Sequence, residues 1–153
     1  LLQRVVQVEL TDTLREALGK TYSPGVGAST PRIWRGYGTF ALRASVDVKE
    51  VAATRAAIRR LLEELRKAPV SADIVQRARA PMLENLDAVL KTNAGWMGLA
   101  DRVQSKPDGI DRFVSSRAIM TALTADDLLA LARRYLDPEQ GLEVLVLPEG
   151  IEP

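Results

Sequence analysis

Residues 14–29, LREALGKTYSPGVGAS, begin with a helical pattern and end with residues that exclude a helix. Before this break, apolar residues recur every four positions, which predicts one helix with a single buried stripe. The stripe comprises Leu2, Val6, Leu10, Leu14 and Leu18. Gly19 follows directly, and glycine commonly ends a helix because it adopts the left-handed conformation without strain. A proline and two glycines come next, so we expect an irregular edge strand over residues 21–30.

Residues 38–48, GTFALRASVDV, alternate between apolar and other side chains. Phe40 and Leu42 belong to the apolar set, and Arg43 belongs to the polar set. A period of two residues is typical of a strand with one face buried. The short loop TPRIWRG precedes this segment, so we expect the two strands to pair as a hairpin.

The rest of the chain has helical periodicity up to a short apolar segment near its end. Pro81 should kink the second of these helices because it removes a backbone donor and crowds the preceding turn. Ser71 and Thr124 are expected N-caps, Thr124 with Asp127 three residues later. The expected helices span residues 49–67, 72–93, 95–105, 111–123 and 125–136, and a strand buried on both faces is expected over residues 142–148. This order predicts an α+β fold, an antiparallel-rich sheet covered by several helices.

Composition excludes several classes of function. The 153 residues suffice for one domain, and 21 basic against 20 acidic side chains give no general reason to expect nucleic acid. No run approaches the roughly 20 apolar residues of a membrane span. The chain has neither histidine nor cysteine, the usual zinc ligands and nucleophile or base of hydrolases. A self-contained hydrolase is therefore not expected, and no metal site is assigned.

Other charged and glycine-rich motifs have ordinary structural explanations. The adjacent pairs Glu63-Glu64 and Asp126-Asp127 point about 100° apart on a helix, so neither pair readily shares a proton or a metal. The basic run of residues 55–67 is interrupted by these glutamates and lacks aromatic residues for base stacking, which indicates a salt-bridged surface. Gly25-Val26-Gly27 lacks the remaining elements of a phosphate loop and precedes a strand where such a loop precedes a helix.

Arg15 and Tyr22 lie on either side of the helix-to-strand break. Taken alone, Arg15 suits the negative end of the helix dipole and lies one turn from Asp12, and Tyr22 suits the start of a strand. These residues by themselves leave both a structural and a functional role open.

The order of motifs along nearly the whole chain resembles the second half of pitrilysin/insulinase-type zinc peptidases. The resemblance begins with LREALGKTYSPGVGAS and continues through the strand and helix of residues 38–65 and PVSADIVQRARAPMLENL. It includes the pair Asn93 and Trp96 and ends with LTADDLLALARRYLDPEQGLEVLVLP. In that family, two homologous halves close around a chamber, and the first half carries an inverted H-x-x-E-H zinc motif. A chain without histidine cannot be that half.

The resemblance implies specific roles and partners. The second half of such peptidases supplies an arginine and a tyrosine at the spacing of Arg15 and Tyr22, and these support the peptide and its transition state. The chain itself should bind no cofactor, with zinc in the partner half, and should cleave nothing alone. Expected partners are the N-terminal zinc-binding half, on the same protein or another subunit, and a peptide substrate, with no nucleic acid. The family domain has further strands before its first helix, so this chain is expected to be a fragment of the domain. The alternative is a structural or interaction domain of an inactive family member.

Overall fold

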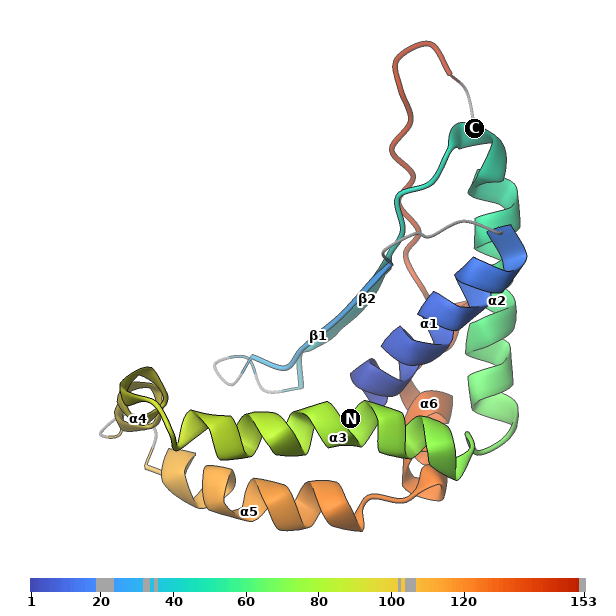
Figure 1. Cartoon of the computed structure of the whole chain (residues 1–153). Coiled ribbons are helices and arrows are strands. Elements are labelled where there is room, and N and C mark those ends of the chain that lie inside the picture. The colour runs from blue at the N-terminus through green and yellow to red at the C-terminus, as the bar shows by residue number, and fades with distance from the viewer. Residues whose placement is uncertain (19–23, 32–33, 35, 102, 104–106, 152–153) are drawn as a thin grey trace.

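The computed structural model describes residues 1–18, 24–31, 34, 36–101, 103 and 107–151. Helices dominate, and a two-stranded antiparallel sheet lies among them (Figure 1), which confirms the predicted α+β class. No helix in these ranges combines the length and apolar character needed to cross a membrane. The elements are α1 (Leu2–Leu18), β1 (Gly25–Ser29), β2 (Thr39–Arg43), the 3-10 turn η1 (Val48–Glu50), α2 (Val51–Lys67), α3 (Ala72–Val89), α4 (Asn93–Ala100), α5 (Gly109–Ala122) and α6 (Ala125–Tyr135).

Helix α1 is the centre of the hydrophobic core. It contacts α2, α3, α6 and β1, and its residues Val5, Val6, Leu10 and Leu14 are at most 1% exposed. Val6, Leu10 and Leu14 of the predicted stripe therefore form the buried face of α1, which Val5 widens. Burying large aliphatic side chains stabilises a fold by about 1.5–3 kcal/mol each, so α1 fixes the position of everything packed on it.

The sheet is the hairpin that the sequence predicts, with Gly25 opposite Arg43 and Ser29 opposite Thr39. Val26 of β1 is buried, and Phe40 and Leu42 of β2 pack against the same core. The expected strand over residues 38–48 ends early, at Arg43, and residues 44–47 have no regular structure. β1 starts at Gly25, which pairs with Arg43, so residues 44–47 have no residue of β1 opposite them to pair with.

Helices α3, α4 and α5 form an arm that extends away from α1 and α2, with α5 running back alongside α3 (Figure 1). Ser71 caps α3 by accepting a hydrogen bond from the Ile74 amide, as predicted, and Pro81 lies inside α3. The expected helix over residues 72–93 is in fact interrupted after Val89. The Thr92 side chain accepts a hydrogen bond from the Gly95 amide and starts α4 instead.

The strand expected near the C-terminus is absent, which corrects the prediction for residues 142–148. These residues have no regular secondary structure, and Leu142, Val144 and Val146 are 93%, 76% and 87% exposed. No strand among the described residues pairs with them. The backbone amides and carbonyls of a strand need hydrogen-bond partners on a neighbouring strand, so a short apolar run alone does not form a strand.

Arginines of α2 hold the segment that follows α6. Arg66 pairs with Asp137 at 3.2 Å, Arg59 with Glu139 at 2.6 Å, and Arg55 with Glu143. The basic run is therefore a salt-bridged surface, as predicted. Arg59, however, pairs with a distant segment of the chain, where its own helix was expected to supply the partner.

Candidate functional site

Arg15 is an exposed cation in the last turn of α1. Its Nη1 lies 3.7 Å from Oδ1 of Asp12, and the two side chains are 60% and 36% exposed. Asp12 has a closer partner in Arg77 of α3, whose Nη2 lies 3.2 Å from its Oδ2. An exposed pair at such a distance contributes about 0–1 kcal/mol, so Asp12 holds Arg15 weakly.

Tyr22, the other predicted site residue, lies outside the described residues, and its distance from Arg15 stays a prediction. The chain resumes at Pro24 and enters β1 at Gly25. In Figure 1 the end of α1 and the end of the hairpin where β1 begins lie at the same end of the molecule. The structure thus places Arg15 and the entry to β1 on one side of the fold.

The hairpin has one face toward the core and one face away from it. Val26, Phe40 and Leu42 point toward the helices, so the residues that alternate with them point outward. A shallow hollow of about 210 Å³ lies on the sheet and is lined by Gly25, Val26, Gly27, Ala41 and Arg43. Apart from Arg43, this outward surface has only glycine and alanine side chains at that end.

Two glutamines of α1 bind the outer backbone edge of β1, a feature that sequence reasoning missed. The Gln7 side chain accepts a hydrogen bond from the Val26 amide at 2.9 Å and donates to the Pro24 carbonyl at 2.8 Å. Gln3 donates to the Val26 carbonyl at 2.5 Å. The i,i+4 spacing of Gln3 and Gln7 on the helix next to an edge strand is the signal that could have indicated this contact.

Two carboxyl groups with shifted pKa values, Glu9 and Asp127, lie away from the hairpin hollow. Partial burial, and next the charge of Asp12, raise the pKa of Glu9 on α1. Hydrogen bonds from the Thr124 backbone and hydroxyl lower the pKa of Asp127 at the start of α6. Both have a local structural cause, packing in one case and a helix cap in the other, so neither indicates an acid or base catalyst.

The chain does not fit a zinc site. It has no histidine and no cysteine, and within the described ranges no three acidic side chains are arranged to hold a metal ion. Any zinc ligands must therefore come from residues outside this sequence or from outside its described part.

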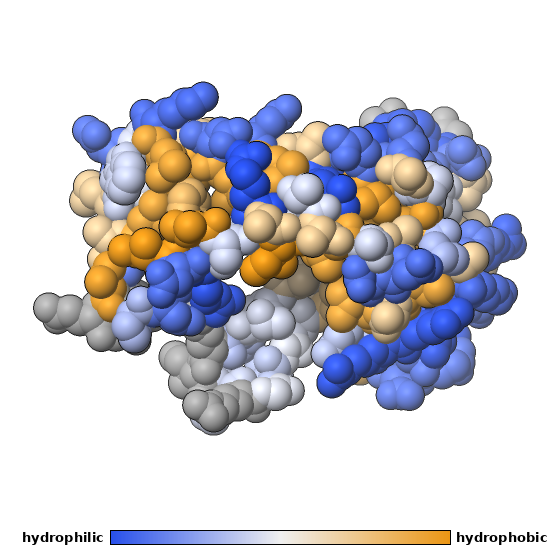
Figure 2. All heavy atoms as spheres, turned by 90° about the horizontal axis from the view of Figure 1, so that it is seen from below, coloured by the Kyte–Doolittle hydropathy of each residue, from blue (hydrophilic) through white to orange (hydrophobic). Residues whose placement is uncertain are grey.

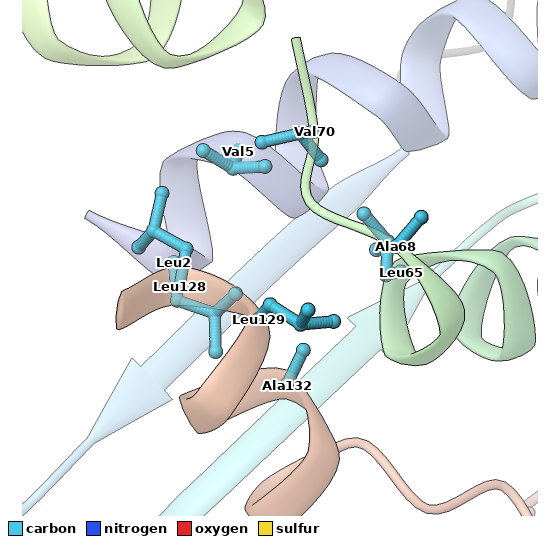
Figure 3. A pocket seen from close by; sticks show the side chains of 8 residues that line it. All are labelled: Leu2, Val5, Leu65, Ala68, Val70, Leu128, Leu129 and Ala132. Atoms are coloured by element: carbon cyan, nitrogen blue, oxygen red, sulfur yellow. The ribbon is translucent and has the colours of Figure 1, made fainter. Parts of the chain in front are cut away.

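A void in the core is no ligand site either. It lies between α1, α2 and α6, and aliphatic side chains such as Leu2, Leu65 and Leu128 point into it (Figure 3). Its volume is about 10 Å³. A water molecule needs at least about 10–15 Å³ and several polar partners, so this space is a small packing defect.

Comparison with known proteins gives one match. A family model described as "Peptidase M16 inactive domain" matches residues 1–82, which cover α1, the hairpin, α2 and the first part of α3. This agrees with the resemblance to the non-catalytic half of pitrilysin/insulinase-type peptidases. No curated protein and no solved structure gave a match.

Proposed function

The chain belongs to the peptidase M16 family as its inactive domain, and we propose that it is the non-catalytic half of a zinc metalloendopeptidase. In this role it forms one wall of the substrate chamber, and its partner is the zinc-binding half. Arg15 and Tyr22 support the peptide at the active site of that partner. The weak attachment of Arg15 to Asp12, at 3.7 Å, is the observation that supports this role best.

The physical reason is that a guanidinium binds substrate only if the protein does not already use it. Arg15 is 60% exposed, and Asp12, its one ionic partner among the described residues, also pairs with Arg77. It lies at the end of α1, from which the chain passes Tyr22 and enters the hairpin. A guanidinium and a phenol supply hydrogen-bond donors, which stabilise the negative charge that develops on a peptide carbonyl oxygen during hydrolysis.

Substitution in the assembled enzyme tests this proposal. Tyr22→Phe should lower kcat with little change in KM, by about 100- to 1,000-fold, the usual effect of removing one such donor. Arg15→Ala should impair both kcat and KM, because a cation that contacts substrate carbonyls acts in the ground state as well.

Arg112→Ala on α5 is the matched control for Arg15→Ala. Arg112 is 64% exposed and lies 3.8 Å from Asp108, the N-cap residue of α5, so like Arg15 it is an exposed arginine with a long contact to a nearby aspartate. If Arg15→Ala cleaves peptides as well as Arg112→Ala does, or if Tyr22→Phe melts early yet retains parental turnover, the proposed role of the pair is wrong.

A second candidate function is that of an interaction domain in an inactive family member. It is favoured by apolar side chains exposed on the arm, where Trp96, Met97 and Val114 are 57%, 73% and 71% exposed. Figure 2 shows hydrophobic residues spread widely over the face seen from below, which includes part of this arm. An H-x-x-E-H motif in the partner half favours the peptidase, and degenerate residues at that motif favour this second function.

A further inference from the structure

The two glycines of β1 have no structural reason within the described residues. Neither Gly25 nor Gly27 has a positive φ, and a Cβ atom added to either would meet no heavy atom within 4 Å. Glycine inside a strand destabilises it, since it loses more conformational entropy than other residues and packs no side chain. Glycine at such positions often marks a place where a ligand or another backbone approaches closely.

The glycines and one cation share a surface. Gly25 is directly opposite Arg43, and Gly27 is directly opposite Ala41, so all four residues lie on the outward face of the hairpin. The Arg43 side chain is exposed and has no hydrogen bond or ion pair with any other residue that the structure describes. The outward face at this end of the hairpin is therefore mostly exposed backbone, with the positive charge of Arg43 at its edge.

The size of the hollow defines what it can hold. Its volume of about 210 Å³ is below the roughly 300–1,000 Å³ of pockets that enclose a small molecule. It therefore suits one segment of a longer, extended ligand. A nucleic acid is disfavoured because Arg43 is the only basic residue among the described residues that line the hollow, and phosphate backbones are bound by several cations together.

We propose that this outward face binds an acidic segment of an extended peptide. The peptide backbone lies across Gly25 and Gly27, and a glutamate or aspartate carboxylate pairs with the Arg43 guanidinium, whose planar fork matches a carboxylate. The inference rests on the proposed function, because it assigns to the chamber wall a preference among peptide substrates. Arg43 lies opposite Gly25, at the end of the hairpin where β1 begins, so the bound peptide would cross the sheet at that end.

Peptide binding to the 153-residue chain tests the proposal without any cleavage. The probes are three fluorescein-labelled eight-residue peptides in which alanine alternates with glutamate, glutamine or lysine, and binding is measured by fluorescence anisotropy at low salt. The glutamate peptide should bind tightest. Arg43→Gln should weaken its binding about 5- to 10-fold, the range for one charge-assisted contact, and should leave the glutamine peptide unchanged. Arg43→Lys should retain part of the preference, and Arg43→Glu should transfer it to the lysine peptide.

Gly27→Val tests separately whether the peptide backbone lies across the glycines of β1. A Cβ atom added at Gly27 meets no heavy atom within 4 Å and valine favours strands, so the variant should fold, as circular dichroism can verify. It should weaken the glutamate and glutamine peptides alike, by about 10-fold, because it occupies the space of the peptide backbone. Arg112→Gln on the arm is the control for Arg43→Gln and should leave all three peptides unaffected.

Three results would overturn the inference: no binding of the glutamate peptide, equal binding of the glutamate and glutamine peptides, or unchanged binding after Arg43→Gln. Because the assay needs neither zinc nor the partner half, its failure leaves the kinetic test of Arg15 and Tyr22 intact. Conversely, normal turnover of the Tyr22→Phe enzyme contradicts the proposed function whether or not the chain binds acidic peptides.

Discussion

Gln7 joins the central helix to the edge of the sheet, so its removal should destabilise the fold far more than an ordinary surface substitution. Gln7→Ala eliminates the bond from the Val26 amide at 2.9 Å and the bond to the Pro24 carbonyl at 2.8 Å. Each bond contributes about 0.5–1.5 kcal/mol, and a buried amide left without a partner costs about 1–3 kcal/mol. Val26 is only 7% exposed, so water replaces the lost acceptor poorly.

The expected loss is therefore about 2–3 kcal/mol in the free energy of unfolding, or about 4–12 °C in Tm for a chain of this size. Urea denaturation followed by circular dichroism measures the first quantity, and hydrogen exchange at the Val26 amide reports the contact itself. In Gln7→Ala, the exchange rate of the Val26 amide should rise more than that of any other amide of β1.

Gln140→Ala is the matched control, because Gln140 makes one exposed hydrogen bond, to Asp137 at 3.2 Å. It should change stability by no more than about 0.5 kcal/mol, as surface substitutions usually do. A loss in Gln7→Ala no greater than in this control, with unchanged exchange at Val26, would show that α1 does not hold the edge of β1 in this way.

Two further predictions concern pH. Burial raises the pKa of Glu9 above its unfolded value, so ionised Glu9 destabilises the fold at neutral pH. Glu9→Gln should therefore be more stable than the parent at pH 7, and this gain should disappear as the pH falls to about 4. An equal gain at both pH values in urea titrations would contradict this prediction. Thr124 lowers the pKa of Asp127, so the stability that Asp127 provides is present above the ordinary value of about 3.9 and is lost as the pH falls through the lowered pKa. Asp127→Asn should thus melt earlier than the parent at pH 7 and alike at pH 2, and thermal melts that differ equally at both pH values would refute the assignment.

Local signals in the sequence predicted the helices well. The apolar stripe with a spacing of four residues, which includes Leu10, identified the buried face of α1. Ser71 and Thr124 mark the starts of α3 and α6 as expected. A helix depends on hydrogen bonds and caps within a short segment, so its sequence contains most of the information. The expected end of the helix at residue 93 was wrong for a local reason as well, because α3 ends at Val89 and Thr92 caps the start of α4.

Features that depend on distant partners were not predictable in the same way. The short apolar run of residues 142–148 indicated a strand buried on both faces, yet no neighbouring strand exists for it in the part of the chain that the structure describes. The strand register that places Arg43 opposite Gly25 depends on tertiary structure. In the sequence alone, the two glycines resembled only an incomplete phosphate-loop motif. Arg15 was found through the family resemblance, because its surroundings in the sequence are equally those of a structural arginine.

The glutamines on the edge of β1 occupy the place where a further strand would pair with Val26. Val26 directs its backbone groups to Gln3 and Gln7, so the side-chain amides replace a neighbouring strand there. The alternation of an antiparallel ladder leaves the amides and carbonyls of Phe40 and Leu42 directed away from β1, on the opposite border. An additional strand can therefore pair with β2, whereas pairing through Val26 of β1 is blocked by the helix that also holds the core together, and exposed strand edges are where aggregates begin.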